Sequence, residues 1–121
     1  MPHFILVFIG GGLGAASRYG LSTALTSSSH KIPWGILACN LLGCLLIGAL
    51  YGFVKSHHPH WISPLAVTGF LGGFTTFSTF ALDTQKLVEA GNYGTAISYV
   101  LISIIAGLAL SVIGCMAAVR F

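Results

Sequence analysis

Long apolar runs alternate with short polar segments along this chain, and the pattern repeats four times. Three of the runs contain no charged residue, and they lie between Lys31 and Lys55, between Lys55 and Asp83, and between Glu89 and Arg120. Each is longer than the roughly 20 apolar residues that an α-helix needs to cross a bilayer. A further uncharged run precedes Arg18 and resumes after it as far as Lys31. The pattern predicts four membrane-spanning helices, at about residues 4–26, 34–54, 62–88 and 93–119.

The composition agrees with this pattern. Hydrophobic residues make up 55% of the chain and charged residues only 6%, whereas a soluble domain carries about a quarter charged residues. We therefore expect an all-α integral membrane protein in which residues 1–121 form one transmembrane domain within the lipid bilayer. The five Lys and Arg residues are scattered over the loops. They form no basic patch, which excludes nucleic acid as a partner.

The charges of the loops show almost no bias between the two sides of the membrane. With four spans, Lys55 and Arg120 lie on one side, while Lys31 and Lys86 lie on the other. The side with more Lys and Arg normally stays in the cytoplasm, and here neither side has more. We therefore predict that the chain inserts in both orientations and that two oppositely oriented copies form an antiparallel, dual-topology homodimer.

The third predicted helix contains a polar interruption. Gly72 and Gly73 are followed by four hydroxyl residues, which are Thr75, Thr76, Ser78 and Thr79. Adjacent glycines and β-branched threonines are poor helix formers, so we expect the helix to break near residues 72–78. Freed backbone groups are tolerated at membrane depth only inside protein or along a wet cavity, and freed carbonyl oxygens can bind Na⁺. The alternative is a kinked packing helix whose hydroxyls bond to their own carbonyls.

Aromatic and polar side chains near the interruption could contact an ion. Phe74, Phe77 and Phe80 recur every three residues. Such a stripe usually packs in a core, but the positive edges of the rings could also stabilise a small anion. Asn40 is the one strongly polar residue of the second span, and its amide either contacts an ion or forms an interhelical hydrogen bond worth about 1 kcal/mol. Arg18 lies inside the first span, where a charge is functional by default or a structural anchor.

The chain lacks the residue patterns of an enzyme. It has no phosphate-binding loop, no nucleophile paired with a base and no carboxylate dyad. No acidic residue lies deep in a span, although a proton-coupled exporter normally needs one. The missing carboxylate counts against a small dual-topology multidrug or cation exporter, which we keep as an alternative function. A non-transporting helper of a larger membrane complex is a further alternative.

Three segments resemble a known family across the whole chain. They are GGLGAASRY at residues 11–19, GILACNLLG at 35–43 and GFLGGFTTFSTF at 69–80. In this order and spacing they resemble the CrcB/Fluc fluoride channels, and Tyr99 follows where that family has a tyrosine. The sequence departs from the family at Phe74, which is more often aliphatic there, and at Asp83, where a glutamate is usual.

The resemblance implies a passive, fluoride-selective channel that exports fluoride across the cell inner membrane. It implies an antiparallel homodimer with two pores, each lined by Asn40, Phe77, Ser78, Thr79, Phe80 and Tyr99. It also implies a structural Na⁺ at the dimer interface, held by the backbone carbonyls of Gly72 and Thr75. We further expect Arg18 to contribute a positive field in an anion vestibule.

Overall fold

A computed structural model describes residues 3–25, 32–57 and 61–120, and these residues form helices joined by short connections. Four segments are long and apolar enough to cross a membrane, and they are His3–Leu25, Trp34–Lys55, Ser63–Glu89 and Tyr93–Arg120. The prediction of an all-helical protein with four such segments is confirmed. Lys31, which contributed to the comparison of loop charges, lies outside the described residues.

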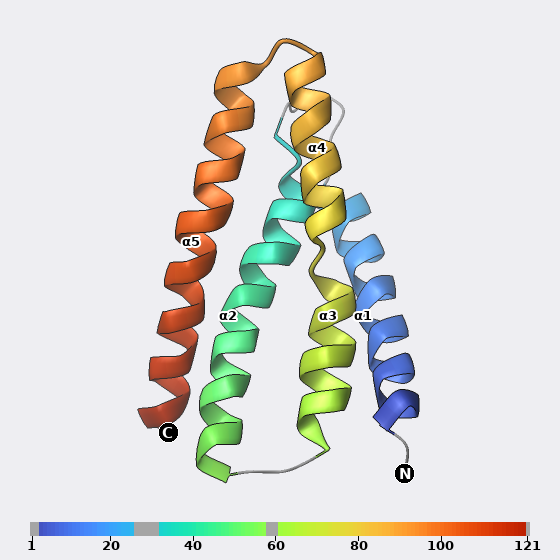
Figure 1. Ribbon diagram of the computed structural model, residues 1–121, viewed down its shortest axis with the longest axis vertical. Coiled ribbons are helices and arrows are strands. Elements are labelled where there is room, and N and C mark those ends of the chain that lie inside the picture. The colour runs from blue at the N-terminus through green and yellow to red at the C-terminus, as the bar shows by residue number, and fades with distance from the viewer. Residues whose placement is uncertain (1–2, 26–31, 58–60, 121) are drawn as a thin grey trace.

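The first, second and fourth segments are continuous helices. They are α1 (His3–Leu25), α2 (Trp34–His57) and α5 (Tyr93–Arg120). The ends of α1 and α5 that are nearest the two chain termini lie at the same end of the bundle (Figure 1). An even number of crossings returns the chain to the side on which it began.

The third segment consists of three helical pieces. Helix η1 (Ser63–Leu71) has the wider hydrogen-bonding pattern of a π-helix and runs directly into α3 (Gly72–Phe74). Thr75 (φ −92°, ψ 153°) and Thr76 (φ −148°, ψ 125°) are extended, and α4 (Phe77–Glu89) begins after them. Below we call Thr75 and Thr76 the extended dipeptide.

The third segment changes its packing partner at the extended dipeptide. Before it, η1 and α3 pack against α1, whereas after it α4 packs against α5. Helices α2 and α5 lie side by side over most of their length (Figure 1). The bundle thus consists of one continuous helix pair, α2 with α5, and one pair in which α1 faces an interrupted partner.

Glycines bring the helices of both pairs into backbone contact. A Cβ atom on Gly14 of α1 would collide with the carbonyl of Phe70, and one on Gly10 with the carbonyl of Leu65. In the other pair, a Cβ atom on Gly48 would collide with Ser111 and one on Gly114 with Leu45. Small residues at such contacts are the usual basis of helix association in lipid, where packing replaces the hydrophobic effect.

A tight turn joins α4 to α5. The Asn92 N–H donates to the Leu87 carbonyl (2.9 Å) and the Gly91 N–H to the Val88 carbonyl (3.0 Å). Gly91 has a φ of 81°, a conformation that a side chain disfavours. This pair of hydrogen bonds is a Schellman motif. It ends α4 and returns the chain directly into α5.

Candidate functional site

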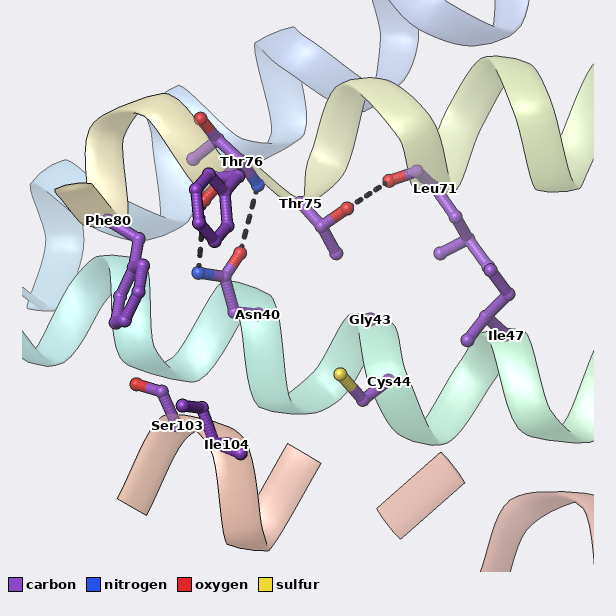
Figure 2. Close-up of a pocket in the computed structure, with 11 residues that line it drawn as sticks. Asn40, Gly43, Cys44, Ile47, Leu71, Thr75, Thr76, Phe80, Ser103 and Ile104 are labelled. Carbon is purple, nitrogen blue, oxygen red and sulfur yellow. Dashed lines mark hydrogen bonds between the residues drawn. The ribbon is translucent and has the colours of Figure 1, made fainter. Parts of the chain in front are cut away.

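The site is centred on the extended dipeptide and on Asn40 of α2, which faces it. The Asn40 Oδ1 atom accepts a hydrogen bond from the Thr76 N–H (2.9 Å), and the Asn40 Nδ2 atom donates to the Thr76 carbonyl (3.3 Å). Figure 2 shows both bonds, with the amide lying against the backbone of the extended dipeptide. Asn40 thus supplies the donor and the acceptor that a neighbouring peptide group would supply, and it satisfies backbone groups that the interruption frees.

The extended dipeptide removes helical donors from the carbonyls before it. In a continuous α-helix, the Thr76 N–H would donate to the carbonyl of Gly72, but here it donates to Asn40. The Arg18 Nε atom of α1 donates to the carbonyl of Gly73 (3.0 Å). Arg18, which the sequence placed in a vestibule, therefore contacts the end of α3.

Thr75 bonds back towards α3. Its N–H donates to the Leu71 carbonyl (2.9 Å), and its Oγ1 atom donates to the same carbonyl (2.8 Å). A Cβ atom on Gly43 of α2 would collide with the Thr75 methyl group, so the absence of a side chain at Gly43 makes room for Thr75. The Thr75 hydroxyl is thus bonded to its own helix, as the alternative interpretation of the hydroxyl cluster predicted.

The other three hydroxyl residues gather at the start of α4. The Thr76 Oγ1 atom caps this helix by accepting from the Thr79 N–H (3.1 Å), and it lies 3.2 Å from the Ser78 Oγ atom and 3.3 Å from the Thr79 Oγ1 atom. A threonine at this position satisfies one of the free N–H groups at a helix start. The start of a helix also carries a partial positive charge, which favours an anion nearby.

Three aromatic rings form a chain beside this cluster. The Phe77 and Phe80 ring centroids are 5.7 Å apart with the ring planes at 51°, and those of Phe80 and Tyr99 are 5.1 Å apart at 44°. Phe77 is 80% exposed, whereas Tyr99 is completely buried. The rings therefore lead from the protein surface to its interior, each tilted against the next.

Phe74 differs from the other two phenylalanines of the sequence stripe. It is only 4% exposed and stacks on Phe70, with ring centroids 5.7 Å apart and planes at 14°. It packs with Cys39 and Leu71 in a buried cluster. The stripe is therefore divided, with Phe74 in the core and Phe77 and Phe80 beside the hydroxyl cluster.

A cavity of about 320 Å³ lies between α2, the extended dipeptide and α5. Figure 2 shows its lining side chains. The lining residues are Asn40, Gly43, Cys44, Ile47, Leu71, Thr75, Thr76, Phe77, Phe80, Ser103 and Ile104. Of the predicted pore residues, the cavity brings together Asn40, Phe77 and Phe80. Ser78 and Thr79 contact Thr76 from the helix start, and Tyr99 packs against Phe80 without lining the cavity itself.

The sequence did not single out several lining residues as site residues, among them Thr76, which bonds to Asn40, and also Ser103 of α5 and Cys44 of α2. Ser103 lies four residues after Tyr99 on the same face of α5, and this spacing was a usable signal. Cys44 lies four residues after Asn40 in α2, and apolar thiols in a span carry no distinctive signal. Whether Ser103 and Cys44 line the cavity depends on which faces of α5 and α2 meet.

Three buried side-chain oxygens near the site lack a hydrogen-bond partner among the described residues. They belong to Asp83, Tyr99 and Ser103. Buried polar groups are nearly always paired, so these oxygens are available to water or to an ion. Within residues 3–25, 32–57 and 61–120, no three His, Cys, Asp or Glu side chains are grouped to hold a metal ion.

Comparison with known proteins identifies the family. A family model described as "CrcB-like protein, Camphor Resistance (CrcB)" matches residues 5–115. A fluoride-specific ion channel FluC of Francisella philomiragia is 47% identical over 116 residues, which cover 91% of this chain and 89% of the relative. FluC proteins of Bordetella petrii and Paracoccus denitrificans are 45% and 43% identical, over 93% and 94% of this chain and 88% and 93% of theirs. With a match over most of its length, the chain belongs to the CrcB family.

Proposed function

We propose that this protein is a passive, fluoride-selective channel through which fluoride leaves the cytoplasm. The observation that carries the proposal is the cavity at the extended dipeptide, where Asn40 and Phe80 meet the start of α4. Relatives that match about nine-tenths of the chain are named fluoride-specific ion channels. Family membership favours a channel over the multidrug exporter and over an enzyme.

The chemistry of the site suits a small, strongly hydrated anion. Fluoride can enter a narrow path only if directed donors replace its water. Asn40 uses one N–H of its amide on Thr76, and an amide nitrogen carries two, so one donor remains. The hydroxyls of Ser78 and Thr79, the ring edges of Phe77 and Phe80 and the buried Tyr99 hydroxyl add further contacts. These groups are neutral, which leaves binding weak enough for the ion to move on.

A passive path is sufficient for export. Hydrogen fluoride is a weak acid that crosses membranes in its neutral form and releases fluoride in the more alkaline cytoplasm. Because accumulated fluoride then stands above its electrochemical equilibrium, an open anion path lets it leave without coupling to protons. This agrees with the absence of an acidic residue deep in any span.

The working unit in this proposal is an antiparallel homodimer in the cell inner membrane. In one copy, Phe77 is 80% exposed and Ser78 is also exposed. A hydroxyl that faces hydrocarbon is costly unless protein or water covers it. A second, inverted copy would cover this face, and the near-equal loop charges favour insertion in both orientations. The third span of each copy would then be interrupted within the membrane and sealed by its partner.

A Na⁺ ion between the two copies fits the backbone of the interruption. The carbonyl of Gly72 loses the helical donor that Asn40 takes, and Thr75 lies in extended chain. Carbonyl oxygens of an unwound helix are suitable Na⁺ ligands. One copy offers two such carbonyls, from Gly72 and Thr75, so two copies would supply four. The ion would be structural and would join the two interruptions.

Efflux from liposomes tests the proposal. Purified protein is reconstituted with potassium fluoride inside, and a fluoride electrode follows release after valinomycin is added. We expect rapid fluoride release and no comparable chloride release. Equal release of both ions, or none above protein-free liposomes, would reject the proposal.

A change of Asn40 tests the site within the same assay. Asn40→Asp removes the donor to the Thr76 carbonyl and sets a negative charge against it, so we expect efflux to fall roughly 100-fold or more. Asn40→Ala separates the lost donor from the added charge. The dimer should persist in both variants by gel filtration. Normal efflux from Asn40→Asp would remove Asn40 from the path.

A further inference from the structure

Arg18 occupies a defined position at the end of α3. Gly10, Gly14 and Arg18 are spaced by four residues and share one face of α1, and both glycines are buried against the third segment. Gly73 meets the same helix, because a Cβ atom there would collide with the carbonyl of Gly11. Arg18 therefore reaches the third segment one helical turn after Gly14, the last glycine of α1 that contacts this segment closely. Its Nε atom donates to the Gly73 carbonyl at 3.0 Å.

The Gly73 carbonyl needs this donor. In a continuous α-helix it would accept from the N–H of Phe77, but Thr75 and Thr76 are extended and Phe77 begins a separate helix. The last carbonyls of a helix lack internal partners and carry a partial negative charge. The Arg18 guanidinium suits the Gly73 carbonyl in both respects, because it donates a hydrogen bond and carries a positive charge. Arg18 thus makes on the α1 side a contact comparable to that of Asn40 on the α2 side.

The backbone of Arg18 is itself held in place. The Cys39 Sγ atom of α2 lies 3.8 Å from the Arg18 carbonyl, to which it donates, and Cys39 is completely buried. The guanidinium is therefore directed from a helix that contacts both η1 and α2.

We propose that Arg18 is a positioning residue, which keeps the third segment interrupted by capping the Gly73 carbonyl through its Nε atom. This inference rests on the proposed channel function, because its consequence is a correctly placed extended dipeptide for ion passage. In this role the directed N–H group of Arg18 is essential, and its charge only strengthens the hydrogen bond. The vestibule role predicted from the sequence depends on the charge alone, so the two roles can be separated.

Substitutions at Arg18 separate the donor from the charge. Glutamine carries its amide nitrogen at the same number of bonds from the backbone as the Nε atom of arginine, so Arg18→Gln keeps the N–H donor and removes the charge. Arg18→Lys keeps the charge and moves the donor one bond further. Arg18→Met keeps a similar apolar length and removes both. The three variants are compared with the wild type by fluoride efflux, normalised to the protein recovered in each liposome sample.

We expect Arg18→Gln to retain efflux within about threefold of wild type and Arg18→Met to lose about tenfold, which is the typical effect of one lost charge-assisted hydrogen bond. The comparison of these two variants decides the proposal. If Arg18→Gln falls as far as Arg18→Met while Arg18→Lys stays active, the charge acts and the capping role is wrong. If Arg18→Met matches wild type, or if all three variants fall equally, the capping role is also wrong.

Hydrogen–deuterium exchange tests the cap independently of transport. We expect the amides of Thr75 and Thr76 to exchange faster in Arg18→Met than in wild type and at the wild-type rate in Arg18→Gln. If wild type carries no fluoride but shows this exchange pattern, the channel function fails and the cap stands. If wild type carries fluoride and exchange is identical in all variants, the cap fails and the channel stands. Should Arg18→Met not fold, Arg18→Gln and Arg18→Lys are compared in its place, and faster exchange in Arg18→Gln than in Arg18→Lys would overturn the cap.

Discussion

The two helix pairs of this protein use similar glycine contacts for different purposes. In the pair of α2 and α5, glycines hold two continuous helices together over most of their length. In the other pair, glycines hold α1 against a segment that stops being helical at Thr75. The continuous pair contributes Asn40 and Ser103 to the cavity, and the interrupted segment contributes the extended dipeptide, Phe77 and Phe80.

An interruption in a membrane-spanning segment needs partners for its freed backbone groups, and here a continuous neighbouring helix supplies them. The freed backbone groups of Thr76 bond to Asn40, which belongs to the continuous pair. A flexible α2 would leave those groups without partners in an apolar surrounding, at a cost of about 1–3 kcal/mol each. We call the pair of α2 and α5 the frame, because the interruption of the third segment packs against it through Asn40. The predictions below test that division of roles.

The largest effect is expected from damage to the frame. Gly114→Val introduces side-chain atoms where even a Cβ atom would collide with the Leu45 carbonyl. Overpacking of this kind typically costs 1–3 kcal/mol or more, and we expect most of the protein to be lost as aggregate in detergent gel filtration. Gly94→Ala is the control, because a Cβ atom there meets nothing within 4 Å. Normal recovery of Gly114→Val would show that the close contact is dispensable.

A second prediction compares two phenylalanines of the interrupted segment. Phe80→Ile removes the ring that contacts both Phe77 and Tyr99, so we expect fluoride efflux to fall by about tenfold or more. Phe74→Leu changes a ring that is buried in the core and stacks only on Phe70 among the described rings. We expect this variant to lose some thermal stability and to keep its efflux. A greater loss of efflux from Phe74→Leu would contradict the division of the aromatic stripe.

A third prediction concerns the start of α4. Thr76→Val keeps the shape of the side chain and removes the hydroxyl that accepts from the Thr79 N–H. Loss of such a cap costs about 1 kcal/mol. If that cost falls on the conducting state, efflux falls about fivefold. Thr76→Ser retains the hydroxyl and should transport at the wild-type rate. If the two variants transport equally, the cap does not support the path.

The smallest effect on transport is expected outside the site. Gly91→Ala forces a side chain into a left-handed conformation at φ 81°, which costs about 1–2 kcal/mol. We expect a lower melting temperature in detergent and unchanged efflux below it. Gly12→Ala, where a Cβ atom meets nothing within 4 Å, should not lower the melting temperature. A loss of efflux from Gly91→Ala at low temperature would mean that the turn supports the site directly.

Apolar run length was sufficient to predict the four helical segments, because crossing lipid requires a minimum length and excludes charge. The sequence also indicated where the candidate site lies, since glycines, hydroxyls and phenylalanines in residues 69–80 are unusual inside a membrane helix, but it did not single out Ser103 or Cys44. The proposed dimer and the Na⁺ site stay predictions. Loop charges and the exposed Phe77 and Ser78 favour the dimer, and the carbonyl that loses its helical donor at the interruption favours the Na⁺ site.

The partners of these residues could not be predicted in the same way. Asn40 and Thr76 are 36 positions apart, and Arg18 and Gly73 are 55 apart. Their contacts depend on how far each helix slides along its neighbour, and backbone collisions at glycines determine that position. The same hydroxyl chemistry is used in two ways within two residues, with Thr75 bonded back to Leu71 and Thr76 bonded forward to Thr79. The local sequence does not show which threonine bonds backward and which bonds forward. Thr75 packs against Gly43 of α2, and that contact depends on the tertiary structure.

The order of the two backbone contacts along the chain has a consequence for biosynthesis. A ribosome makes Arg18 and Asn40 before Gly73 and Thr76, so the side chains that bond to the interruption are synthesised before the interruption itself. The newly inserted segment can therefore exchange water for protein partners at once, without passing through lipid with bare carbonyls. A circular permutation that moved α1 and α2 behind α5 would retain every contact of the final fold and lose this sequence of events.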